Sequence, residues 1–140
     1  MKPARVVLWI AGLMFVGFGV AFSLWPLPAA RVVEIPLPTP TARIDFAATY
    51  GGFSLGFGAF LILCAGRAAW LEPGLVAAGA ALGGLALIRI QGILAAAGPP
   101  LPVILIGLGA ELAGVAVCVL VLRHLRRVGA LAPGSAAGSS

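Results

Sequence analysis

The chain has 140 residues, of which 61% are hydrophobic and only 9% are charged, and its formal net charge is +5. Because an ordinary soluble domain carries roughly 25% charged residues, this composition leaves too few polar side chains to cover a soluble globule and predicts a membrane protein. The basic residues stand at the ends of apolar segments, without the interleaved aromatic residues of a nucleic-acid-binding surface. The positive charge is therefore interpreted as a pattern that orients helices in a bilayer, with no nucleic-acid partner.

Four apolar runs follow one another along the chain, at about residues 6–25, 44–65, 75–97 and 103–122. A helix needs about 20 mostly apolar residues to cross a bilayer, so each run is predicted to span it once. The expected fold is all-α, an antiparallel bundle of four transmembrane helices within residues 1–127. Residues 128–140, which end in "APGSAAGSS", are expected to form a disordered cytoplasmic tail.

The segments between the runs support this division. Five prolines lie in "WPLPAARVVEIPLPTPT", between the first two runs, and predict an extended loop because proline breaks helices. "GRAAWLEPG" separates the second run from the third. "GPPLP" leaves only a short turn between the third and fourth runs, so those two helices should form an antiparallel hairpin.

The placement of lysine and arginine predicts the orientation of the bundle. Six of these residues lie on the side of the two termini and two on the other side, so both termini are expected in the cytoplasm. The first run also has the features of a signal peptide with a cleavage site near residues 21–23, and the sequence leaves open whether this span is retained. The six residues are Lys2, Arg5, Arg67, Arg123, Arg126 and Arg127, and the two are Arg31 and Arg43.

Two opposite charges lie inside the third and fourth runs. Arg89 precedes Pro99 by ten residues, and Glu111 follows Pro100 by eleven. At about 1.5 Å per helical residue, each charge lies roughly 15 Å from the turn, near the middle of a hydrocarbon core about 30 Å thick. Because an unpaired charge at that depth is costly, we expect a midplane ion pair between Arg89 and Glu111. The pair could serve only to fix the helix register, or could also contact a ligand.

Glycines mark the expected sites of close helix packing. Gly52 and Gly56, in "ARIDFAATYGGFSLGFG", have the GxxxG spacing that lets two helices approach closely in lipid. Gly107 and Gly114 lie on the same face of the fourth helix as Glu111. We expect all four glycines to line helix contacts.

The start of the second run carries the remaining polar candidates. One interpretation places Arg43, Asp45 and Tyr50 at the outer mouth of a polar pocket that reaches down to Arg89 and Glu111. Direct contact would need a bend or water, since Asp45 is expected about 10 Å above Arg89 by helical rise. The alternative interpretation is a packing seam beside a lipid-facing aromatic stripe.

Other chemistry has little support in the sequence. Cys64 and Cys118 are expected to be small buried hydrophobic residues, with a thiol redox pair as the alternative. His124 lies in "RHLRR", which is typical of a basic segment beside anionic lipid. No metal-ligand cluster, cofactor motif or catalytic motif is recognisable, so no metal and no cofactor are predicted. The motifs favour a non-catalytic role without deciding whether the protein is an enzyme.

The block "ARIDFAATYGGFSLGFGAF", the arginine of the third run and "AELAG" in the fourth together resemble an uncharacterised bacterial membrane family, domain of unknown function 4345. That family is similar to the DoxX-like four-helix membrane proteins. The resemblance covers about residues 6–122 and implies a four-helix bundle in the bacterial inner membrane, with no established activity. It draws attention to seven residues, and adds Gly51 to the expected packing positions. The seven are Arg43, Asp45, Tyr50, Gly51, Gly52, Arg89 and Glu111.

Three functions remain open at this point. The first is a non-catalytic accessory protein, or one that interacts with lipid or a small ligand. The second is a small dimeric transporter that uses Glu111. The third is a redox or quinone-linked subunit, as the DoxX-like resemblance implies, although the chain has no paired-cysteine motif. The expected partners are the lipid bilayer and, beyond it, another membrane protein or a second copy of the chain.

Overall fold

The computed structural model describes residues 1–131, which form a succession of helices with no strand. Four stretches are long and apolar enough to cross a membrane, which confirms the predicted number of spans. The protein is therefore a multi-pass membrane protein. Its elements are α1 (Lys2–Leu24), α2 (Pro26–Val32), α3 (Pro40–Phe46), the π-helix η1 (Ala47–Gly52), α4 (Phe53–Gly66), the 3₁₀-helix η2 (Ala68–Trp70), α5 (Leu71–Ala95) and α6 (Pro102–Leu131).

The helices extend beyond the predicted spans at several ends. The second span begins at Pro40, where the side chain of Thr39 accepts a hydrogen bond of 3.1 Å from the backbone N–H of Ala42. Such a cap satisfies one of the free N–H groups of a first helical turn. α6 continues to Leu131, so residues 128–131 are helical where a disordered tail was predicted. The basic segment continues the helix because arginine and leucine are good helix formers; the rest of the predicted tail lies outside the described residues.

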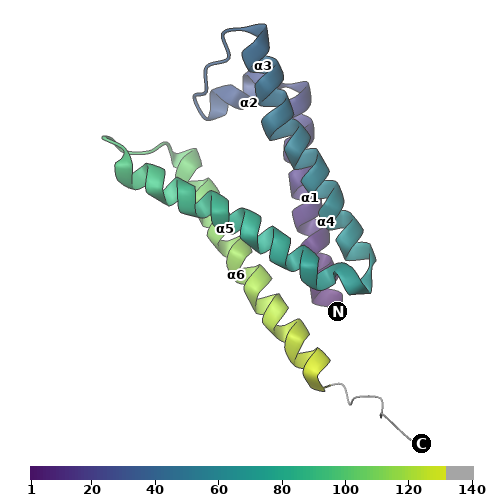
Figure 1. Cartoon of the computed structure of the whole chain (residues 1–140). Coiled ribbons are helices and arrows are strands. Elements are labelled where there is room, and N and C mark those ends of the chain that lie inside the picture. Colours follow the sequence, from purple (N-terminus) through teal and green to yellow (C-terminus); the bar gives the residue numbers. More distant parts are fainter. Residues whose placement is uncertain (132–140) are drawn as a thin grey trace, which may run out of the picture.

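The four spans form two hairpins, α1 with α3–α4 and α5 with α6 (Figure 1). The hairpins meet at the end of the molecule where the N-terminus lies, and they diverge toward the opposite end. The buried core lies where they meet, and its members come from all four spans. The structure is all-α with four spans, as predicted, and the spans are arranged as a pair of splayed hairpins. The core consists of Ala4, Leu8, Leu61, Cys64, Ala65, Leu71, Leu75, Ala78 and Cys118.

The two hairpins come into close contact at Gly74. A Cβ atom at this position would lie 2.7 Å from Cβ of Cys64 and 3.0 Å from Cδ1 of Leu8, so only glycine permits this approach. Gly74 thus lets α5 cross directly over α1 and α4.

The first hairpin is held by two pairs of glycines that lie seven residues apart on each helix. A Cβ atom on Gly58 would lie 2.7 Å from the carbonyl oxygen of Gly12, and one on Gly19 would lie 3.0 Å from the carbonyl oxygen of Gly51. The backbones of α1 and α4 therefore come into direct contact, as in other small-residue interfaces in membranes.

This contact corrects part of the packing prediction. A Cβ atom on Gly52 or Gly56 would meet nothing within 4 Å, so neither glycine lines a helix contact. The reason is η1, since a π-helix takes about one more residue per turn than an α-helix and rotates the faces that follow it. Successive buried residues of this span are therefore five positions apart across the π-helix, at Phe46 and Gly51. Beyond it they are three or four positions apart, at Ser54 and Gly58.

Candidate functional site

The side chains of Arg89 on α5 and Glu111 on α6 form the predicted ion pair. Nη2 of Arg89 donates to Oε1 of Glu111 at 2.7 Å, and Nε donates to Oε2 at 3.0 Å. Two parallel hydrogen bonds of this kind fix the direction of both groups as well as their distance. The expected pair between the third and fourth spans is confirmed.

Small residues around the pair explain how the two helices accommodate it. The guanidinium lies over Gly107 of α6, where a Cβ atom would be 3.5 Å from its Cζ atom. One helical turn beyond Glu111, a Cβ atom on Gly114 would lie 2.6 Å from Cδ1 of Leu82. Gly107 and Gly114 thus both lie in the contact between α5 and α6.

Arg89 lies closer to the turn than the roughly 15 Å expected from the sequence, whereas Glu111 lies at about the expected distance. α5 ends at Ala95, six residues after Arg89, and α6 begins at Pro102, nine residues before Glu111. By helical rise these intervals are about 9 Å and about 14 Å. The sequence estimate counted from the prolines, but residues 96–101 are not helical and add no helical rise.

The two partners differ in exposure. The side chain of Glu111 is 9% exposed, whereas that of Arg89 is 28% exposed. Nη1 of Arg89 donates to no group of the described residues, and no buried side-chain nitrogen among them lacks a partner, so this nitrogen reaches the surface. A guanidinium has five N–H groups. Glu111 therefore occupies one edge of the guanidinium and leaves the other edge available.

Arg89 also lines an open hollow of about 270 Å³ near the turn between α5 and α6. Apart from the guanidinium, its walls are apolar. The lining residues are Arg89, Gly92, Ile93, Ala96, Pro100 and Ile104.

Arg89 lies on the same face of α5 as Ala78 and Leu82. Arg89 follows Ala78 by eleven residues, which is about three helical turns and returns to the same face. Ala78 belongs to the core where the hairpins meet. The same face packs on α6, since Leu82, seven residues before Arg89, lies 2.6 Å from a Cβ atom built on Gly114.

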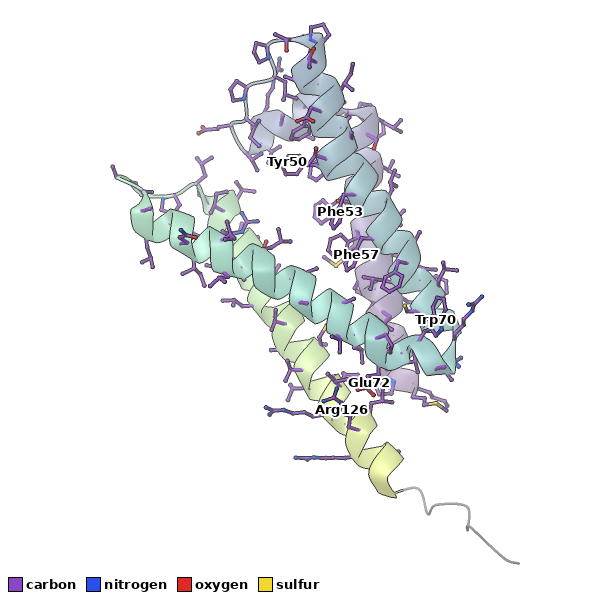
Figure 2. All side chains as sticks on the ribbon, in the orientation of Figure 1. Tyr50, Phe53, Phe57, Trp70, Glu72 and Arg126 are labelled. Atoms are coloured by element: carbon purple, nitrogen blue, oxygen red, sulfur yellow. The ribbon has the colours of Figure 1, made fainter. Side chains whose placement is uncertain are left out.

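The first hairpin is rich in aromatic residues. All seven phenylalanines and the single tyrosine of the chain lie between Phe15 and Phe60, within the first hairpin. The side chains of Tyr50, Phe53 and Phe57 project from this hairpin toward α5 (Figure 2). Tyr50 is 48% exposed and Phe53 is 64% exposed. The divergent end of the molecule thus has an aromatic wall on one hairpin and small residues with a guanidinium on the other.

The structure brings together only part of the predicted polar pocket. Nε of Arg43 donates to the backbone oxygen of Leu37 at 3.5 Å, within its own loop, and Asp45 makes no hydrogen bond to a described residue. The ring of Tyr50 packs against Phe46, with ring centroids 4.8 Å apart. These three residues lie on the first hairpin, whereas Arg89 and Glu111 lie on the second, and the structure shows no hydrogen bond between the two groups.

A second ion pair was missed by the sequence analysis. Nη2 of Arg126 donates to Oε1 of Glu72 at 2.6 Å, at the opposite end of the same two helices (Figure 2). Glu72 was assigned to a loop but lies in the first turn of α5, where a negative charge suits the helix dipole. The spacing could have predicted this pair, because Glu72 precedes Arg89 by 17 residues and Arg126 follows Glu111 by 15. On two antiparallel helices these similar intervals place Glu72 and Arg126 at a similar level.

The remaining candidate groups are two thiols. Cys64 and Cys118 are both unpaired and buried, at 0% and 3% exposure. Within residues 1–131, no three histidine, cysteine, aspartate or glutamate residues are grouped so that they could hold a metal ion.

Over residues 3–122 the chain matches the family model described as "Domain of unknown function (DUF4345)". No curated protein and no solved structure matches the chain.

Proposed function

The chain belongs to the family of domain of unknown function DUF4345, and we propose that it is a non-catalytic membrane protein that holds a small amphipathic molecule between its two hairpins. One observation carries this proposal. The guanidinium of Arg89 is fixed by Glu111 on one edge, and Arg89 lines an apolar hollow beside the turn between α5 and α6, while Tyr50, Phe53 and Phe57 project toward α5 from the other hairpin. Apolar surroundings with a few fixed polar groups are typical of small-molecule sites.

The ion pair supports binding better than chemistry. Glu111 already accepts three contacts from Arg89, at 2.7, 3.0 and 3.2 Å, so its carboxylate is engaged as an acceptor. The two thiols are enclosed in the core where the hairpins meet, away from the hollow. A rigid, paired guanidinium orients a bound group without exchanging a proton with it, because arginine stays protonated in proteins.

The proposal includes a location and an orientation. We place the protein in the inner membrane of a bacterium, with both termini in the cytoplasm, because lysine and arginine are concentrated at the end where the termini lie. The hollow would then be in the outer half of the membrane. A distant relation to the DoxX-like four-helix proteins is compatible with the four spans.

Co-purification of lipid tests the proposed function. Gly92 lines the hollow and Gly109 does not, and a Cβ atom at either position would meet nothing within 4 Å, so each helix should accept a larger residue there. The wild-type protein and Gly109→Phe, purified in mild detergent, should retain about one amphipathic molecule per chain, measured by native mass spectrometry. Gly92→Phe fills the hollow and should retain none. If the wild type retains nothing, or if Gly92→Phe retains as much as Gly109→Phe, the proposed function is wrong.

A further inference from the structure

We infer that the hollow beside Arg89 selects an amphiphile with an anionic headgroup, a phospholipid whose phosphate binds the free edge of the guanidinium. This inference rests on the proposed function, because it names the chemical class of the molecule that the hairpins hold. It adds a headgroup preference, which the proposed function does not require.

The donors that remain on Arg89 define the recognition. After the bonds to Glu111, both N–H groups of Nη1 and one N–H of Nη2 have no protein acceptor among the described residues. An N–H group without a partner is costly in an apolar environment. Two neighbouring N–H groups on one edge of a guanidinium match two oxygens of a phosphate, and hydrogen bonds to a charged acceptor are stronger than those to a neutral one.

The carboxylate of Glu111 does not occupy the place that the phosphate would take. Its oxygens lie on the edge formed by Nε and Nη2, whereas Nη1 is on the far side of the guanidinium. An anion on that far side would complete a row of carboxylate, guanidinium and phosphate. Arg89 would then link the hairpin to the lipid and would stay paired with Glu111.

The depth of the hollow suits a lipid headgroup. Arg89 lies about 9 Å from the end of α5 by helical rise. Pro100, in the turn itself, is one of the lining residues. The hollow therefore reaches from the membrane interface to the guanidinium, while the acyl chains would lie against the aromatic wall of Tyr50, Phe53 and Phe57.

The second ion pair provides a matched control. Glu72 and Arg126 join the same two helices by the same chemistry, but their side chains are 47% and 60% exposed and they line no part of the hollow. Arg89→Met combined with Glu111→Leu removes the anchoring pair without leaving a lone charge. Glu72→Leu combined with Arg126→Met makes the equivalent change at the other end of the hairpin.

The experiment measures lipid retention by native mass spectrometry after reconstitution in nanodiscs of equal parts phosphatidylglycerol and phosphatidylcholine. Both lipids carry a phosphate, but the choline cation of phosphatidylcholine would repel the guanidinium, so the wild type and the Glu72→Leu, Arg126→Met variant should retain phosphatidylglycerol severalfold over phosphatidylcholine. The Arg89→Met, Glu111→Leu variant should lose this preference. Inorganic phosphate at millimolar concentration should not displace the lipid, because it lacks the apolar part.

A second measurement does not depend on how the variants fold. A phosphatidylglycerol analogue with a photoreactive group on its headgroup should label the wild-type chain between Arg89 and Ile104. Labelling confined to the basic end of α6 would overturn the inference, as would displacement by inorganic phosphate. Equal retention of the two lipids would overturn the headgroup preference and leave the proposed function standing, whereas retention of neither lipid would overturn both.

Discussion

The two arginine–glutamate pairs differ in their surroundings and not in their chemistry. Arg89 and Glu111 are paired inside the helix contact, beside Gly107, whereas Arg126 and Glu72 are exposed at its end. Both pairs have hydrogen bonds of less than 3 Å. Because the strength of a charge interaction depends on its access to water, the same contact should have different consequences at the two sites.

Removal of one partner of the Arg89–Glu111 pair should lower the stability of the protein more than removal of both. Arg89→Met leaves the carboxylate of Glu111 enclosed without a counter-charge, and breaking a buried pair in this way costs about 3–5 kcal/mol. Adding Glu111→Leu removes the stranded charge and should restore most of the stability. Thermal unfolding in detergent should therefore rank the double variant above Arg89→Met. A double variant less stable than the single one would contradict this prediction.

The exposed Glu72–Arg126 pair should contribute little to the stability of the protein. An exposed ion pair is worth about 0.2–1 kcal/mol, so Arg126→Met should lower the free energy of unfolding by less than about 1 kcal/mol. Salt screens exposed charges, and the effect should shrink further in high-salt buffer. Unfolding of Arg126→Met and the wild type at two salt concentrations tests this, and a salt-independent loss as large as that of Arg89→Met would count against the distinction.

At the scale of the helix, the contact between α1 and α4 depends on the order of α-helical and π-helical turns. The five-residue step from Phe46 to Gly51 brings Gly51 and Gly58 onto α1 and turns Gly56 away from it. Once Gly58 touches the backbone of α1, there is no space for a side chain. The packing of this hairpin is therefore set by backbone contact more than by side-chain shape.

Gly58→Ala and Gly56→Ala form a matched test of this contact. The new methyl group on Gly58 would lie 2.7 Å from the Gly12 carbonyl oxygen and 2.8 Å from the Val16 backbone nitrogen, so the helices must separate. We expect a loss of about 1–3 kcal/mol, as for other overpacked sites. Gly56→Ala has free space and should be neutral or stabilising, because alanine favours helix by about 1 kcal/mol over glycine. Equal melting temperatures for the two variants would contradict the assignment.

The sequence predicted the elements of this fold better than the faces by which they pack. Run length and charge spacing were enough to predict four spans and the Arg89–Glu111 pair, because both depend on helical rise alone. The faces of Gly52 and Gly56 could not be predicted, since a single π-helical turn rotates everything that follows it. Glu72 was missed because the helix begins earlier than the apolar run does.

At the scale of the molecule, the crossing at Gly74 joins two hairpins that are otherwise separate over much of their length (Figure 1). Apolar patterning carries no information on such divergence, because lipid and protein surroundings favour the same side chains. The sequence could not distinguish splayed hairpins from a closed bundle for that reason.

Gly74→Val should open the crossing, with Cys64 as its reporter. The new side chain would collide with Cβ of Cys64, so the hairpins must move apart there, whereas Cys118 contacts α5 at another place, near Gly79. A membrane-permeant maleimide should label Cys64 faster in this variant than in the wild type, and Cys118 at an unchanged rate. Gly84→Val, where a Cβ atom would meet nothing within 4 Å, is the control. Unchanged labelling of Cys64 would show that Gly74 does not join the hairpins.

The central claim is that Arg89 and Glu111 join α5 to α6 inside a lipid bilayer, and solid-state NMR can measure this contact directly. Dipolar recoupling between ¹⁵N-labelled arginine guanidinium groups and ¹³C-labelled glutamate carboxylates should give a strong signal in Glu72→Gln, in which only the inner pair, with its Nη2–Oε1 distance of 2.7 Å, remains. The signal should disappear when Glu111→Gln is added. Absence of the signal in Glu72→Gln would contradict the account.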